Sequence, residues 1–174
     1  MASAFVQATA VGVRRQAKTS DDSVSLRRFL TEVQKYPSLV SREYYISLYA
    51  GKGPLHVELG QHDFHRVAGE HNPHVPTEFV EDRIRELMEA VGTIEHYVDR
   101  RVAHYDKRRL AEPTPTFADL SAALRTLERI VILYWRLLKG ASMTTLLPTI
   151  QFDWQDVFRF AWMAAQRTNT HEVM

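Results

Sequence analysis

A short stretch past the middle of the chain concentrates side chains that could bind phosphate or transfer protons. Residues 97–106 read Tyr-Val-Asp-Arg-Arg-Val-Ala-His-Tyr-Asp, which brings two guanidiniums, an imidazole and two carboxylates close together in sequence. The imidazole of His104 can take or give a proton near neutral pH. The guanidiniums of Arg100 and Arg101 can bind phosphoryl oxygens through paired hydrogen bonds. The stretch therefore fits a phosphate site.

The same residues also suit a helix end that binds no ligand. Cations are favoured near a helix C-terminus by the macrodipole, so Arg100 and Arg101 could form a solvated basic end. His104 could cap backbone carbonyls there or pair with Asp106. Both interpretations stay open from the residues alone.

A long amphipathic helix has to position this stretch. Apolar residues recur three and four apart over about six turns, which predicts a helix from about Pro76 onward. Its apolar positions are Val80, Ile84, Leu87, Val91, Ile94, Val98 and Val102. At about 100° per residue, Arg100 lies about 40° and Arg101 about 60° from His104 around such a helix, so either can share its face.

Helical periodicity accounts for most of the remaining chain. We predict a helix from the Asp21 to Ser23 capping cluster to Lys35, an apolar segment over 38–50, and a short helix around 62–67. The next helix runs from a capping box at Thr116 to Lys139, with Gly140 as its C-terminal cap. An amphipathic segment follows Asp153, and its apolar side carries Trp154, Val157, Phe158, Ala161, Trp162 and Ala165.

These segments predict an all-α protein, because no stretch shows a convincing period of two. The architecture expected is an up-and-down bundle of about four main helices plus short extra helices. Residues 1–20 are expected to form a loosely ordered N-terminal arm or a short first helix, and residues 21–174 a single helical domain. The helix over 116–139 and the aromatic segment after it offer more apolar surface than one small bundle hides, so we expect a homodimer.

Composition narrows the possible partners and locations. The chain has 174 residues, a formal net charge of +1 and no cysteine, so any contact with nucleic acid must be local and thiolate zinc sites are excluded. We expect a cytoplasmic protein that does not enter a membrane, because no apolar run is long enough to span one. The first 15 residues lack acids and carry their charges after the apolar stretch, the reverse of a secretory signal and closer to an organellar presequence.

A second group of polar residues, in the least regular part of the chain, could hold a metal. Its members are His56, His62, His65, His71 and His74. Histidine and carboxylate can build a zinc site, but no strict ligand spacing is present, and we expect surface or loop-packing roles, no bound metal and no cofactor.

The pattern around His104 resembles a known family. A long helix that ends in Ala103-His104-Tyr105-Asp106, a proline-rich turn and a Leu-rich helix resemble the HEPN superfamily, and within it the AbiU-like branch named after a phage abortive-infection protein. The resemblance covers about residues 41–158. It implies a helical bundle that commonly dimerises. Many members are metal-independent ribonucleases whose signature is an arginine, four to six residues and then a histidine, often with a polar residue after the arginine.

One position of that signature differs in this chain. Val98 stands where the resemblance places the arginine, and Asp99 stands where it places the polar follower. The residues that it implies for catalysis are His104, Arg101, Arg100 and Asp99. Those that it implies for RNA binding are Arg100, Arg101, Tyr105, Lys107 and Arg108.

The sequence therefore leaves two alternative functions, which belong to different classes. The first is a HEPN-like protein that acts on or binds RNA in phage defence or stress response, as a metal-independent endoribonuclease with an antitoxin or another protein as partner. The alternative is a non-catalytic helical protein-interaction module with a degraded HEPN site. The valine at position 98 favours the second.

Overall fold

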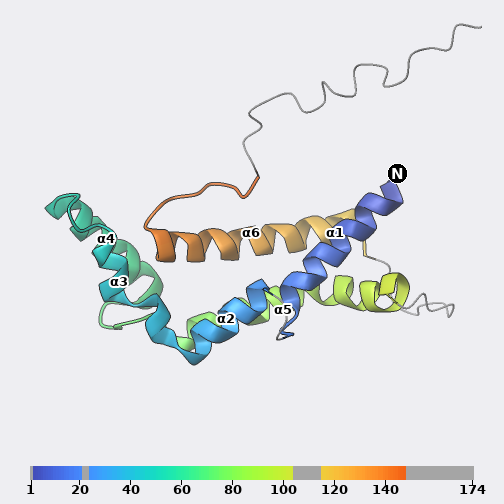
Figure 1. The fold of residues 1–174 in the computed structure, drawn as a ribbon, viewed down its shortest axis with the longest axis horizontal. Coiled ribbons are helices and arrows are strands. Elements are labelled where there is room, and N and C mark those ends of the chain that lie inside the picture. Colours follow the sequence, from blue (N-terminus) through green and yellow to red (C-terminus); the bar gives the residue numbers. More distant parts are fainter. Residues whose placement is uncertain (1, 21–23, 104–114, 148–174) are drawn as a thin grey trace, which may run out of the picture.

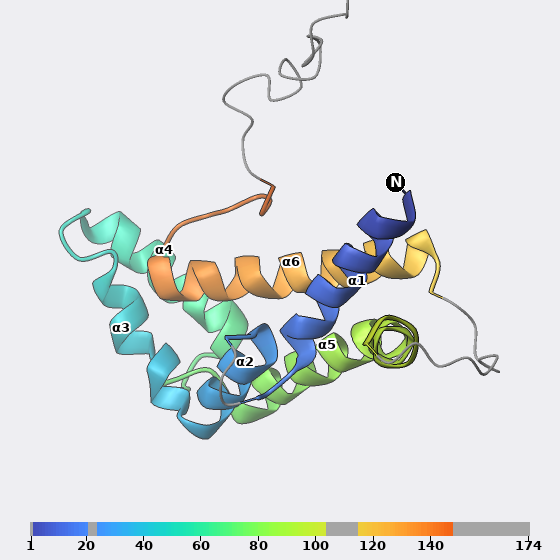
Figure 2. The same ribbon diagram turned by 45° about the vertical axis from the view of Figure 1, so that its right-hand side comes forward.

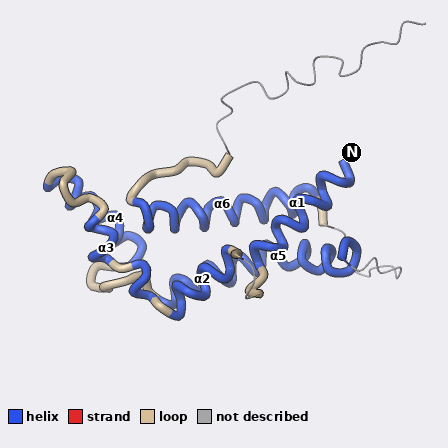
Figure 3. Tube along the Cα trace, in the orientation of Figure 1, coloured by secondary structure: helices blue, strands red, loops and turns tan. Residues whose placement is uncertain are grey.

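All regular structure in the described part of the chain is helical. The computed structural model describes residues 2–20, 24–103 and 115–147, and they form no strand apart from an isolated antiparallel bridge between Ser41 and His74 (Figure 3). The elements in chain order are α1 (Ala2–Ala17), α2 (Leu26–Lys35), the 3-10 turn η1 (Pro37–Val40), α3 (Arg42–Ser47), α4 (Pro54–Ala68), α5 (Thr77–Tyr97), the π-helix η2 (Val98–Ala103) and α6 (Phe117–Lys139). The predicted all-α fold is confirmed.

Helix α5 lies at the centre of a bundle formed with α1, α2 and α6. All three helices pack against it, and Figures 1 and 2 show α6 running along α5 while α1 crosses both. The side chains of α5 that the bundle buries are Val80, Leu87, Val91 and Ile94. These are members of the apolar stripe predicted from the sequence, so helical periodicity correctly identified the face of α5 that forms the core.

Helix α1 occupies most of residues 1–20, for which the sequence left open a loosely ordered arm or a short first helix. Ala10, Val13 and Ala17 are buried on one side of a helix of 16 residues. Because two of these three side chains are small, they let α1 approach its neighbours closely but give a weak hydrophobic signal in the sequence. Of the two alternatives left open for residues 1–20, the structure shows the helix, and this helix is part of the bundle.

Helices α3 and α4 pack against each other at one end of the molecule (Figure 1). Their buried rings, Tyr45 and Phe64, lie 5.6 Å apart between centroids. The short helix expected around 62–67 is longer in the structure, because α4 already begins at Pro54. Proline fits there, since a helix leaves the first N–H groups unpaired.

The predicted ends of α6 are confirmed. The Thr116 N–H donates to Asp119 Oδ2 at 2.7 Å and the Asp119 N–H donates to Thr116 Oγ1 at 3.2 Å, which is a complete capping box. The Thr116 N–H and the Thr116 hydroxyl both donate to the Asp119 carboxylate, and they hold its pKa below its usual range. Gly140 closes the helix in the left-handed region with φ 59°. The amphipathic segment predicted after Asp153 lies outside the described residues.

Two glycines inside helices provide a matched test of this packing. A Cβ on Gly60 of α4 would lie 2.8 Å from Cδ2 of Tyr49, whereas a Cβ on Gly92 of α5 would meet nothing within 4 Å. Gly60→Ala should lower the free energy of unfolding by about 1–3 kcal/mol through overpacking. Gly92→Ala should raise it by about 0.5–1 kcal/mol, because alanine restricts the unfolded chain. Urea titrations of both variants measure the two shifts, and equal shifts of the same sign would contradict the packing of α4 on Tyr49.

Candidate functional site

The predicted site begins where α5 passes into η2. The chain stays helical beyond Tyr97, but residues 98–103 wind as a π-helix, with hydrogen bonds from i to i+5. Such turns are rare and occur often at functional sites. The prediction of one α-helix through this region is therefore wrong in its last turns, and the angles estimated between Arg100, Arg101 and His104 for 100° steps do not apply.

Helix α1 packs against this junction. Its C-terminal half contacts both α5 and η2, as Figures 1 and 2 show from two directions. Val13 of α1 and Val98 of η2 are each only 2% exposed, and Ala17 is fully buried. Apolar contact therefore fixes α1 at the point where the polar stretch starts.

Two cations, one in the last turn of α1 and one directly after it, face two carboxylates across this contact. Arg14 forms an ion pair with Asp99 Oδ1, and Lys18 forms one with Glu95 Oε1. The Lys18 Nζ also lies 3.8 Å from Asp99 Oδ2. The four side chains keep between 22% and 38% of their surface exposed, so water screens each pair. We call Arg14, Lys18, Glu95 and Asp99 the α1–η2 ion cluster.

Val98, which the HEPN resemblance aligns with the arginine of its signature, is in the hydrophobic core. Val98 is 2% exposed and belongs to the same buried cluster as Val91 and Ile94. The interpretation of Val98 as a packing residue is therefore confirmed. A side chain buried among aliphatic neighbours cannot contact a phosphate.

The structure describes only part of the predicted site. Asp99 is engaged by Arg14 and Lys18, and Arg100 is exposed on η2. The backbone of Arg101 belongs to η2, but its side chain is outside the description. The remaining predicted site residues also lie outside the described part of the chain: His104, Tyr105, Lys107 and Arg108.

Sequence reasoning missed Arg14 and Lys18. Both follow positions of α1 that are buried, Val13 and Ala17, so they extend from the edge of its packing face. A prediction of a helix over residues 2–17 would have placed these cations beside its packing face. It could not have shown which carboxylates they reach.

A second polar cluster joins α5 to α6. Glu86 pairs with Arg129 of α6 and lies 3.5 Å from Nε of Arg83 in its own helix. Arg83 also stacks over the Phe79 ring at 5.1 Å. Burial raises the pKa of Tyr134 in the same interface, which keeps its hydroxyl protonated. These groups lie between packed helices, and we interpret them as an interface that holds α5 and α6 together.

The histidines over residues 56–74 do not form a metal cluster. Their region lies entirely within the described chain, and the described residues contain no group of three or more histidines and carboxylates placed to hold a metal ion. His74 instead takes part in the bridge to Ser41, with its Nδ1 3.3 Å from the Val75 carbonyl oxygen. Of the five histidines, His74 thus takes part in loop packing.

Comparisons with protein-family models, with curated proteins and with solved structures gave no match for this chain. The HEPN resemblance therefore depends on the sequence pattern around His104 alone. Separately, none of the helices in the described ranges is long and apolar enough to cross a membrane.

A double-mutant cycle tests the α1–η2 ion cluster. Arg14→Ala, Asp99→Ala and the double variant should give a coupling energy of about 0.5–1 kcal/mol, because the pair is partly shielded and has Lys18 as a neighbour. The matched control is the exposed pair Arg85 and Asp82 on α5, with 65% and 52% of the side chains exposed. Its coupling should be about 0.2–0.5 kcal/mol. Chemical denaturation at low salt gives both values, and a coupling at Asp99 below that of the control would contradict the cluster.

Proposed function

We propose that the protein binds RNA at the end of α5 and at η2, and that it cleaves RNA there without a metal ion. Two elements in contact, α1 and η2, each expose a guanidinium, Arg15 and Arg100 respectively. Guanidiniums bind phosphate through forked, charge-assisted hydrogen bonds. Because the net charge of the whole chain is only +1, attraction of RNA has to come from such a local group of cations.

The observation that supports this proposal most is the compensation of Asp99. An uncompensated carboxylate next to Arg100 would repel phosphate and compete for the guanidinium. Arg14 and Lys18 balance the charges of Asp99 and Glu95 from the α1 side. The exposed Arg100 is then available to a polyanion.

Cleavage would follow from the residues that the family pattern implies. In the proposed reaction, His104 removes the proton of a ribose 2′-hydroxyl, and the 2′-oxygen attacks the adjacent phosphorus. The bond from phosphorus to the 5′-oxygen breaks and the leaving oxygen takes up a proton, which yields a 2′,3′-cyclic phosphate. Arg100 or Arg101 would stabilise the charge on the phosphoryl oxygens in place of the arginine that Val98 replaces.

The AbiU-like resemblance suggests the setting and the partners. A cytoplasmic role in phage defence or stress response fits a protein that degrades RNA on a signal. An antitoxin or another protein would hold the activity in check. A homodimer would bring two His104 side chains into one composite cleft, and light scattering at tens of micromolar protein tests it.

One observation favours a second function. Val98 is buried in the core, so the guanidinium that the signature needs is missing from its usual position. A non-catalytic module that binds a protein partner would need only the exposed cations and not the histidine. The two functions differ in the partner, which is RNA in the first and a protein in the second.

Cleavage of a single-stranded RNA in the presence of a chelator tests the proposed reaction. The wild-type protein should leave 2′,3′-cyclic phosphate ends, and His104→Ala should abolish the activity. Arg100→Ala or Arg101→Ala should lower the rate by about 10²-fold, the usual cost of one donor to a developing oxyanion. Arg85→Ala, which removes an exposed arginine from the opposite half of α5, is the matched control and should cleave at the wild-type rate.

RNA affinity as a function of salt separates the two functions. If binding persists without cleavage, and Arg100→Ala lowers the salt slope by about one unit, the protein binds RNA but does not cut it. Failure of the wild-type protein to cut RNA or to bind it at low salt would refute both RNA roles, and the α5 end would then be a solvated, capped terminus.

A further inference from the structure

Helix α6 has more apolar surface than the described bundle covers. Its core side is buried, but a second stripe at helical spacing is only partly covered, and it consists of Leu124, Val131, Trp135 and Leu138. Leu124 is 46% and Trp135 40% exposed. One helix face thus packs in the core, and the neighbouring face is partly exposed.

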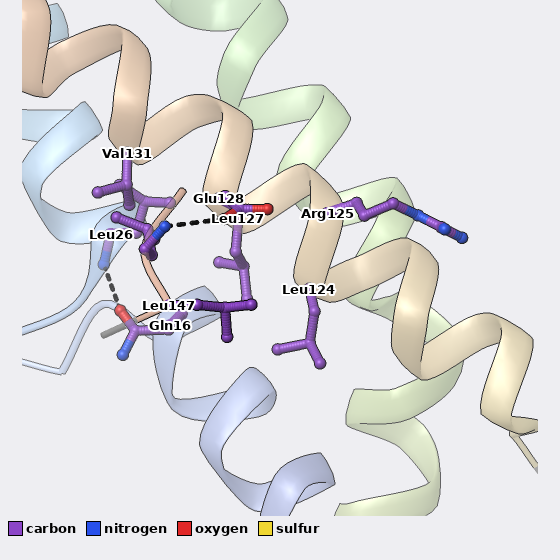
Figure 4. Close-up of a pocket in the computed structure, with 9 residues that line it drawn as sticks. Gln16, Leu26, Leu124, Arg125, Leu127, Glu128, Val131 and Leu147 are labelled. Carbon is purple, nitrogen blue, oxygen red and sulfur yellow. Dashed lines mark hydrogen bonds between the residues drawn. The ribbon is translucent and has the colours of Figure 1, made fainter. Parts of the chain in front are cut away.

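Two adjoining hollows follow this second stripe. The larger, of about 520 Å³, lies between α6, α1 and the start of α2, and its apolar lining includes Leu26, Leu124 and Val131 (Figure 4). The smaller, of about 260 Å³, continues toward the end of α6 beside Trp135 and Leu138, and it shares Leu26 and Val131 with the first. We call the two together the α6 groove.

The chain after α6 returns to this groove. Residues 140–147 run back over α6, as the trace in Figure 3 shows. The carboxylate of Glu128 accepts hydrogen bonds from Thr145 Oγ1 and from the Leu146 N–H, both at 2.8 Å. This anchor lies between Leu124 and Val131 on α6. It brings Leu146 and Leu147 into the lining of the groove, where Leu147 is still 77% exposed.

The next amphipathic segment of the sequence has the length and pattern that the groove requires. Residues 153–165 carry apolar side chains at helical spacing, and as a helix they would be about 20 Å long at 1.5 Å per residue. The open stripe from Leu124 to Leu138 extends about 21 Å by the same rise. Residues 148–152 can span about 17 Å when extended, which is enough to reach either half of the groove from Leu147.

The acidic residues at the start of the segment and its short connection to α6 also support docking of residues 153–165 into the α6 groove. Asp153 and Asp156 fall in the first turn of the segment, where acids stabilise a helix through its dipole. A tether as short as residues 148–152 keeps the segment at millimolar effective concentration beside the groove, which favours docking within the chain over docking on a second copy.

We propose that residues 153–165 form an amphipathic helix that docks into the α6 groove of the same chain. Trp154, Phe158 and Trp162 then cover the stripe from Leu124 to Leu138. The bundle gains a further helix on the outer side of α6. The homodimer proposed above has to use another surface.

Thiol accessibility in the full chain tests this docking. The sequence has no cysteine, so Leu124→Cys introduces a single reporter in the groove and Leu55→Cys a single reporter on α4, at a position 64% exposed. A water-soluble maleimide should modify Cys at position 124 about tenfold more slowly than Cys at position 55, because modification requires the segment to open. Equal rates at the two positions would overturn the proposal.

A matched pair of changes in the segment shows which face docks. Replacing Trp154, Phe158 and Trp162 together by serine should remove the protection of the reporter at 124 and leave that at 55 unchanged. Phe160→Ser alters an aromatic residue on the opposite side of the proposed helix and should leave the protection in place. If Phe160→Ser exposes the reporter as much as the triple change does, the proposed face is wrong.

Dilution separates the same chain from a second copy as the occupant. Protection that is constant from high to low micromolar protein, with a mass that does not change, supports docking within the chain. Protection that falls together with a change from dimer to monomer assigns the groove to a second copy and overturns the proposal. Hydrogen exchange of the wild-type chain needs no substitution, and amides of 153–165 that exchange at the rate of an unfolded peptide would overturn it too.

Discussion

Burial of one apolar face of α5 supports the rest of the described structure. Leu87, Val91 and Ile94 are fully buried, and α1, α2 and α6 all pack on this helix. Each such side chain contributes about 1.5–3 kcal/mol on burial, whereas a partly exposed ion pair contributes about 0.2–1 kcal/mol. Hydrophobic packing therefore decides where α1 lies, and the α1–η2 ion cluster forms as a consequence.

The same packing restricts the chemistry available at the end of α5. The buried face continues into η2 through Val98, so the position that the family pattern gives to arginine is part of the core. Polar chemistry has to use other sides of the helix, where Asp99 is neutralised from α1 and Arg100 is exposed. The site and the core thus share one element, and a change in the winding of η2 would affect both.

Helix α6 divides its apolar residues between two faces. The core face is buried against the bundle, and the second face lines the α6 groove, where Glu128 anchors the chain that follows the helix. An apolar stripe of this length in water would favour association with another apolar surface. In the docking that we propose, the amphipathic segment over 153–165 supplies such a surface in the same chain.

Local patterns in the sequence determined the helices with strong periodicity and clear caps. The α5 stripe, the capping box at Thr116 and the glycine cap at Gly140 all follow from interactions within a few residues, and the structure confirms them. The site was predicted as a stretch of residue types, and the structure describes Asp99 and Arg100 of it. Only the tertiary structure could decide that α1 is a packed helix, that Arg14 and Lys18 reach Asp99, and that the end of α5 winds as a π-helix. These features depend on contacts between segments far apart in the chain. Small side chains such as Ala10 and Ala17 form such contacts but give too weak a hydrophobic pattern for the contacts to be predicted from the sequence.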